Sequence, residues 1–135
     1  MIQYDAKPDL RLLLVRFSGN VTKEEAEKGV DDAAKCLTAL VREFRLLADL
    51  STLSSMDVAC APSIERVMDL CQEHGIAEII RIIPDPSRDI GLGIMSRFHY
   101  ENSVRIFNCS TQEEAFNLLA NGSDIDPAVL RAALA

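Results

Sequence analysis

The chain has 135 residues, of which 48% are hydrophobic and 26% are charged, and its formal net charge at pH 7 is −7. This balance is typical of one globular domain with a sizeable core, and no apolar run approaches the roughly 20 residues that a membrane-spanning helix needs. The negative charge disfavours binding to nucleic acid and to anionic membrane surfaces, so neither is expected as a partner.

Hydrophobic patterning in the first half of the chain predicts two core strands separated by a helix. Residues 12–17 form a dense apolar run, closed by Ser-Gly-Asn at 18–20, which is typical of a buried strand and a turn. A short edge strand is expected at residues 2–5. A capping-box pair and apolar residues at helical spacing predict a long helix over 22–41, and residues 44–50 form the second core strand.

The second half of the chain continues the alternation of helices and strands. Apolar residues at helical spacing, proline and glycine breakers, and hydroxyl residues at helix starts mark the boundaries of the elements. The predicted elements are, in order, a helix from Pro62 to His74, a strand at 79–83, a helix at 90–98, a strand at 104–107, a helix that starts at 110–111, and a tail helix at 126–134.

Strands that are apolar throughout and alternate with helices predict a mainly parallel sheet covered by helices. We therefore expect a single α/β domain over residues 1–135, with a mixed, mainly parallel sheet of four to five strands. Its core spans 10–120, and the tail helix follows it. Partners and ligands of such sheets meet the loops at the carboxyl ends of the strands. Residues 51–61, which are predicted to be a loop, lie at that edge.

The stretch from residue 46 to 71 resembles the core motif of the STAS family, the sulfate transporter and anti-sigma factor antagonist domains. The matching residues are Asp49, Leu50, Ser51, Met56 and Asp57. The family's order of elements also matches the chain over residues 10–119. The resemblance implies the family's α/β fold and a role as a regulatory protein-interaction module.

Two departures from the family pattern affect the expected site. The position of the family's phosphorylated hydroxyl is occupied by Ala59, between Val58 and Cys60, and a methyl group cannot accept phosphate. A kinase-driven switch at Ala59 is therefore excluded. Pro62 lacks the N–H that a helix interior needs, so the helix is expected to begin near Pro62 after a longer loop.

The leading hypothesis is a non-catalytic module that binds a regulatory protein, such as an anti-sigma factor or a kinase-like protein. The predicted partner-binding residues are Asp49, Ser51, Ser54, Ser55, Asp57, Ala59, Cys60 and Ser63. Asp49 and Asp57 have an alternative role, in which their carboxylates accept backbone N–H bonds and order the loop. The serines are either ordinary turn and cap residues or phosphorylation sites, and a phosphate on Ser63 would lie at a favourable helix N-terminus.

A second hypothesis is a carrier or sensor of a small apolar or anionic, lipid-like ligand, held between the 90–98 helix and the sheet. Its candidate residues are Arg88, Arg97, Phe98 and Tyr100. The arginines between 81 and 105 are otherwise interpreted as ordinary surface residues.

A third hypothesis is a thiol enzyme or redox sensor at Cys60, because a helix N-terminus can lower the pKa of a thiol. The chain has four cysteines and two histidines, without a Cys-x-x-Cys pair or a histidine cluster, so we expect neither a metal site nor a cofactor. The N-terminus lacks a signal-peptide pattern, and the cytoplasm is the expected compartment. A homodimer is compatible with so small a module.

Overall fold

The computed structural model describes residues 1–85, 104–121 and 125–134, and its centre is a five-stranded mixed sheet. The strands, in spatial as well as chain order, are β1 (Ile2–Lys7), β2 (Leu12–Val21), β3 (Arg45–Met56), β4 (Glu78–Ile82) and β5 (Arg105–Cys109). The edge strand β1 is antiparallel to β2, and every other pair is parallel. The predicted mixed, mainly parallel sheet is therefore confirmed.

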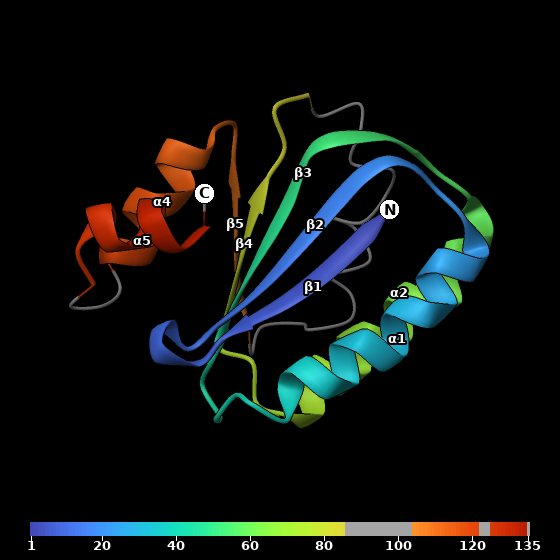
Figure 1. Ribbon diagram of the computed structural model, residues 1–135, viewed down its shortest axis with the longest axis horizontal. Coiled ribbons are helices and arrows are strands. Elements are labelled where there is room, and N and C mark those ends of the chain that lie inside the picture. Colours follow the sequence, from blue (N-terminus) through green and yellow to red (C-terminus); the bar gives the residue numbers. More distant parts are fainter. Residues whose placement is uncertain (86–103, 122–124, 135) are drawn as a thin grey trace.

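Helices cover both faces of this sheet and give the domain three layers, which Figure 1 shows edge-on. One face is covered by α1 (Lys23–Leu37) and α2 (Ala61–Glu73), and the other by α4 (Gln112–Asn121) and α5 (Pro127–Leu134). Two short 3-10 turns, η1 (Pro8–Leu10) and η2 (Val58–Cys60), join β1 to β2 and β3 to α2. The predicted helix at 90–98 lies outside the described residues.

The sheet separates two hydrophobic cores, because neighbouring residues of a strand point to opposite faces. In β2, Leu13 and Val15 pack in the core below α1 and α2, whereas Leu12 and Leu14 pack in the core below α4 and α5. Burial on both faces explains why these strands read as continuous apolar runs.

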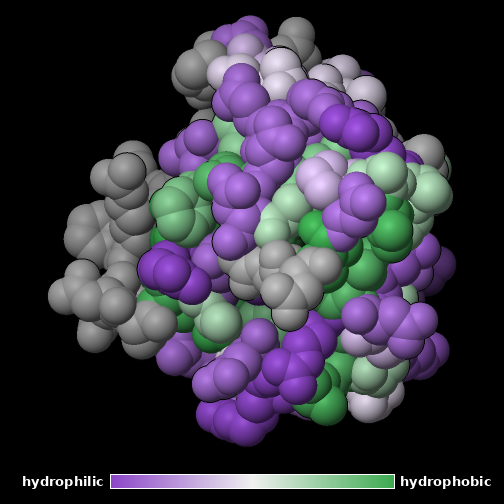
Figure 2. All heavy atoms as spheres, turned by 90° about the vertical axis from the view of Figure 1, so that its left-hand side faces the viewer, coloured by the Kyte–Doolittle hydropathy of each residue, from purple (hydrophilic) through white to green (hydrophobic). Residues whose placement is uncertain are grey.

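The tail helix α5 docks on the sheet as predicted. Leu130 and Leu134 are 0% and 2% exposed in the second core, and Val129 is exposed on the outside. Figure 2 shows this outer side of the molecule, where hydrophilic side chains separate several smaller hydrophobic areas.

Helix α1 begins as predicted but ends earlier than expected. The Thr22 hydroxyl accepts a hydrogen bond from the Glu25 N–H at 3.3 Å, and the Glu25 carboxylate pairs with the Met1 amine at 3.1 Å. After Leu37 the chain turns so that Leu40 is buried, and Val41 is 55% exposed instead of lying on the apolar face of the helix. The predicted extension to Val41 is wrong because tight turns, not further helix, bury Leu40.

Helix α2 ends at the expected position. His74 caps it, and Gly75 follows with a φ of 85°, a left-handed conformation that favours glycine. Strand β5 continues two residues beyond the predicted end, to Cys109, whose side chain is buried in the second core.

Candidate functional site

The carboxyl ends of the parallel strands form one edge of the sheet, and the predicted partner-binding residues gather there. Strand β2 leads into α1, β3 leads through η2 into α2, and β5 leads into α4. In Figure 1 the far ends of β2 and β3 curve over together toward α1 and α2. We call this region, residues 51–63 with the start of α1, the carboxyl edge.

Strands β2 and β3 are longer than predicted, and this changes the nature of the site. Residues 18–20 belong to β2 instead of a turn, and residues 51–56 belong to β3 instead of a loop. The two strands stay paired up to Val21 and Met56, with register shifts at two points. Irregular pairing tolerates the Ser, Gly and Asn residues that normally indicate turns.

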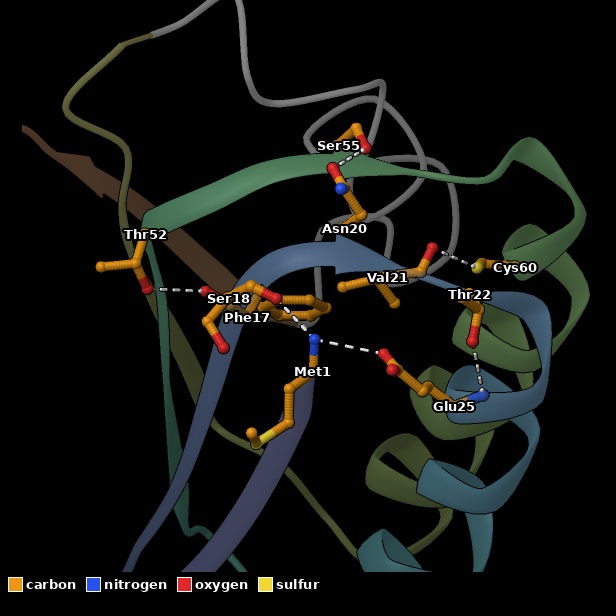
Figure 3. Close-up of polar contacts among 10 residues, drawn as sticks. All are labelled: Met1, Phe17, Ser18, Asn20, Val21, Thr22, Glu25, Thr52, Ser55 and Cys60. Carbon is orange, nitrogen blue, oxygen red and sulfur yellow. Dashed lines mark hydrogen bonds and ion pairs between the residues drawn. The ribbon is translucent and has the colours of Figure 1, made fainter.

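Side-chain hydrogen bonds stabilise this extension of the sheet, as Figure 3 shows. The Thr52 hydroxyl donates to the carbonyl oxygen of Phe17 at 3.2 Å, and the Ser55 hydroxyl donates to Asn20 Oδ1 at 2.6 Å. Leu53 is buried, whereas Ser51 and its hydroxyl-bearing neighbours at 52, 54 and 55 are exposed. Three of the predicted serines, Ser51, Ser54 and Ser55, therefore lie exposed on an ordered strand.

Asp49 has the ordering role that its position in the sequence suggested. Its carboxylate is buried, and Oδ1 accepts hydrogen bonds from both the backbone N–H, at 2.9 Å, and the hydroxyl of Ser51. Gln112 at the start of α4 donates to Oδ2 at 3.5 Å. Asp49 therefore connects β3 to α4. Because Asp49 is only 8% exposed, a partner could contact little of its surface.

Asp57 forms the N-cap of the turn that follows β3. Its Oδ1 accepts the Ala59 N–H at 2.9 Å, and its own N–H donates to the carbonyl oxygen of Val21 at 3.1 Å. The predicted capping role is confirmed. Asp57 is also the only residue between β3 and η2, so the long loop expected at 51–61 is absent.

The start of α2 presents the remaining predicted residues. The helix begins at Ala61 with Pro62 in its first turn, as predicted, and Ser63 is half-buried beside it. Ala59 is exposed, and its neighbour Val58 is 85% exposed.

Cys60 is enclosed below this turn. Its side chain is 0% exposed, and its thiol donates to the carbonyl oxygen of Val21 at 3.8 Å. Burial raises the pKa of the Cys60 thiol, and the neighbouring carboxylates of Asp57, Glu24 and Glu25 raise it further. This environment favours the neutral thiol and offers no activation of a nucleophile.

Three solved structures are similar to this one. The anti-sigma factor antagonist SpoIIAA in its unphosphorylated form has a TM-score of 0.58 at 15% identity, over 91% of this chain and 100% of that chain. The Bacillus cell fate determinant SpoIIAA in its phosphorylated form has a TM-score of 0.57 at 16% identity, over 88% and 99%. An uncharacterized DUF3478 protein from Shewanella loihica PV-4, described as having a SpoIIAA-like fold, has a TM-score of 0.59 at 16% identity, over 88% and 92%.

The chain has a SpoIIAA-like fold. The STAS-like architecture expected from the sequence is thereby confirmed, and at these identities the likeness concerns the fold alone. No protein-family model matches the chain, and no curated protein matches it significantly.

In this SpoIIAA-like fold, a narrow cavity of about 60 Å³ lies between α2 and the sheet. Tyr4 of β1 and Arg81 of β4 mark its two ends, and apolar residues such as Leu50 and Met68 line it between them. Arg81 is only 3% exposed and donates to Asn108 Oδ1 at 3.4 Å, so its interpretation as a surface arginine is wrong. A charge inside an isoleucine-rich strand was the sequence signal for this buried site.

A second, polar recess of about 430 Å³ lies at the carboxyl edge. It is lined by residues 50–54 together with Pro84 and Asp85, so it includes the predicted Ser51 and Ser54. The ligand candidates Arg88, Arg97, Phe98 and Tyr100 lie outside the described residues. Within the described part of the chain, no cluster of His, Cys, Asp and Glu has the arrangement of a metal site. No helix in that part is both long and apolar enough to cross a membrane.

The exposed Val58 is the residue of this edge that sequence reasoning missed. In the sequence, a single valine inside a stretch that departs from the family motif carries no chemical signal. Its exposure depends on the turn that Asp57 caps, which is a property of the folded chain.

Proposed function

We propose that the chain is a non-catalytic, cytoplasmic regulatory module that binds a partner protein, such as an anti-sigma factor or a kinase-like regulator, at its carboxyl edge. The observation that carries this proposal is the rigid, exposed turn at residues 57–59, which is placed at the edge where α/β sheets meet their partners. The likeness to the anti-sigma factor antagonist SpoIIAA supports it.

Binding at this edge is not controlled by phosphorylation at Ala59. SpoIIAA exists in a phosphorylated and an unphosphorylated form. Ala59 has no hydroxyl, although the STAS resemblance aligns it with the family's phosphorylated residue. Ser51, Ser54 and Ser55 are exposed at this edge, where a partner or a modifying enzyme can reach them.

Variants of Asp57 test this proposal. Asp57→Asn keeps an oxygen for the Ala59 N–H but removes the charge, whereas Asp57→Lys removes the cap and reverses the charge. Tagged chains are expressed in the protein's own cells, and co-purified proteins are quantified by mass spectrometry. We expect Asp57→Lys to deplete a stoichiometric partner, and Asp57→Asn to deplete it less.

The matched control is Asp9→Asn, an exposed carboxylate in η1 at the other end of the sheet. This change should leave the partner bound. If Asp57→Lys folds normally, by circular dichroism, and retains the partner at the wild-type level, the carboxyl edge is not the binding surface.

The cavity below α2 favours a second candidate function, the small-ligand carrier. It combines apolar walls with a buried guanidinium at one end, which suits a thin apolar molecule with an anionic group. Its volume of about 60 Å³ is well below the roughly 300 Å³ at which sites for drug-sized ligands begin. A larger ligand therefore requires α2 to move away from the sheet.

Native mass spectrometry of the untagged protein, purified gently from its own cells, separates the two functions. A small molecule that stays bound, and is lost on Arg81→Gln while the chain still folds by circular dichroism, supports the carrier. A chain without a small molecule, purified together with a stoichiometric protein, establishes the interaction module.

A further inference from the structure

The carboxyl edge exposes a small hydrophobic surface formed by Val58, Ala59 and Pro62, which we call the 58–62 surface. Val58 is 85% exposed, the highest value among the large hydrophobic side chains of the described residues, and Val41 follows at 55%. Ala59 and Pro62 are exposed next to it at the start of α2. Cys60 and Ile64 of the same segment are buried. Val58 and Pro62 therefore lie on its solvent side.

The 58–62 surface is held rigidly by the residues on either side of Val58. The Asp57 N–H donates a hydrogen bond to the carbonyl oxygen of Val21 in the neighbouring strand, and the Asp57 carboxylate accepts one from the Ala59 N–H. The Cys60 N–H donates to the Asp57 carbonyl oxygen at 2.9 Å, and the Cys60 side chain is buried below. These hydrogen bonds hold the backbone of Val58 in one conformation. Because the turn is already ordered, binding a partner through the Val58 side chain costs little conformational entropy.

Acidic side chains flank this surface. Asp57 directly precedes Val58 and is exposed. Glu24 is exposed in the first turn of α1, and α1 packs against the η2 turn that carries Val58. In the first turn of α1, Glu25 lies 3.1 Å from the Met1 amine and Lys23 lies 3.8 Å from Glu27. In α2, Arg66 lies 3.9 Å from Glu73. Asp57 and Glu24 therefore give the surroundings of Val58 a negative potential. Figure 3 shows Glu25, Thr22 and Cys60 side by side where β2 enters α1.

The opposite, amino edge of the sheet carries charges of both signs. Arg45 and Arg105 are the first residues of β3 and β5, and Arg11 directly precedes β2. Glu78 pairs with Arg105 at 3.0 Å, and Asp9 is exposed at the same edge. The attraction of a basic partner therefore comes from Asp57 and Glu24 beside Val58. A partner with positive potential is attracted and oriented toward the 58–62 surface.

We infer that Val58 inserts into an apolar pocket of the partner protein, and that lysine or arginine side chains of the partner surround this pocket and meet Asp57 and Glu24. This inference rests on the proposed function and adds the chemistry of the partner to it. A second copy of this chain would bring its own acidic edge against Asp57 and Glu24, and an anionic membrane would repel the same carboxylates.

A photo-cross-linking amino acid at position 58 tests the inference in the full chain, in the protein's own cells. The control carries it at position 41, an exposed valine in the segment that leads from α1 into β3, at the amino edge of the sheet. We expect one discrete product from position 58 and none from position 41. Mapped by mass spectrometry, the partner peptide should contain apolar residues with Lys or Arg beside them.

Charge reversal supplies the second measurement. Glu24→Lys should lower the yield of this product about fivefold and weaken its dependence on salt, whereas Asp9→Lys should leave both unchanged. With the partner thus identified and purified, Val58→Ser should weaken its affinity about tenfold, and Val41→Ser should not.

Other products overturn the inference. Cross-links to a second copy of this chain or to lipid assign the surface to self-association or to a membrane. If Glu24→Lys does not change the yield of the product, the partner's pocket is not surrounded by basic side chains. Cross-links from position 54 but none from position 58 refute Val58 as the anchor while leaving the proposed function intact. If neither position 54 nor position 58 gives a cross-link to another protein, both the inference and the proposed function are refuted.

Discussion

At the scale of single residues, the Asp57 carboxylate both caps a turn and is exposed to solvent. Its Oδ1 satisfies the Ala59 N–H, which would otherwise remain without a partner at the start of the helical segment. Its charge is the part that a partner can use. The two contributions are separable, since asparagine keeps the cap and alanine loses it.

We predict that Asp57→Ala lowers the free energy of unfolding by about 1 kcal/mol and that Asp57→Asn lowers it by only a few tenths. The measurement is urea denaturation followed by far-ultraviolet circular dichroism. Equal losses for the two variants would mean that the hydrogen bond at 2.9 Å does not stabilise the turn.

A tyrosine and two cysteines with raised pKa values give a second prediction at this scale. Burial raises the pKa of the Tyr4 phenol and of the Cys60 and Cys109 thiols, so the folded chain keeps these protons where the unfolded chain loses them. Their contribution to stability is fully present below the ordinary thiol pKa of 9.0 and is lost as pH rises above it. We expect the free energy of unfolding to fall steadily between pH 8.5 and pH 11.

Single substitutions identify the groups responsible. Tyr4→Phe should flatten the decline above pH 10, and Cys60→Ala should flatten the part near pH 9. Iodoacetamide labelling at neutral pH provides an independent check. The half-buried Cys36 should react before Cys60, Cys71 and Cys109, all of which are buried. Fast labelling of Cys60 would instead revive the thiol hypothesis.

At the scale of elements, the contact between α1 and β1 depends on a glycine. A Cβ atom at Gly29 would lie 3.0 Å from Cε2 of Tyr4, which is tighter than nine in ten contacts of real Cβ atoms. The absent side chain therefore lets the tyrosine ring of the edge strand pack directly on the helix.

We predict that Gly29→Ala destabilises the protein by about 1 kcal/mol. Overpacking typically costs about 1–3 kcal/mol, which exceeds the gain of about 1 kcal/mol from replacing glycine inside a helix. Thermal and urea unfolding measure the difference. In a Tyr4→Leu background the clash is removed, so the same change should be neutral or stabilising. A loss of equal size in both backgrounds would place the cause elsewhere.

At the scale of the whole molecule, the second core makes the tail helix part of the fold. Leu130 is 0% exposed between α5 and the sheet, whereas the adjacent Val129 is 51% exposed. We predict that Leu130→Ala costs about 2–5 kcal/mol and that Val129→Ala costs less than about 0.5 kcal/mol. Chemical denaturation monitored by circular dichroism measures both. A small loss for Leu130→Ala would mean that α5 contributes little to the cooperative unit.

The sequence by itself determined the architecture and much of the local structure. Continuous apolar strands indicated a sheet buried on both faces, and the spacing at Thr22 and at Gly75 located helix ends that the structure confirms. The ordering roles of Asp49 and Asp57 were also predicted, because their hydrogen bonds join residues only two positions apart. Such local interactions leave a signal within a few residues of sequence.

Only the tertiary structure decided how the candidate site is built. Residues 51–56 look like a loop in the sequence, but pairing with β2 makes them a strand, and the partner strand lies more than 30 residues away. The burial of Arg81 and the exposure of Val58 likewise depend on which elements pack above them. Pairing and burial arise between segments distant in the chain, so no local pattern contains them.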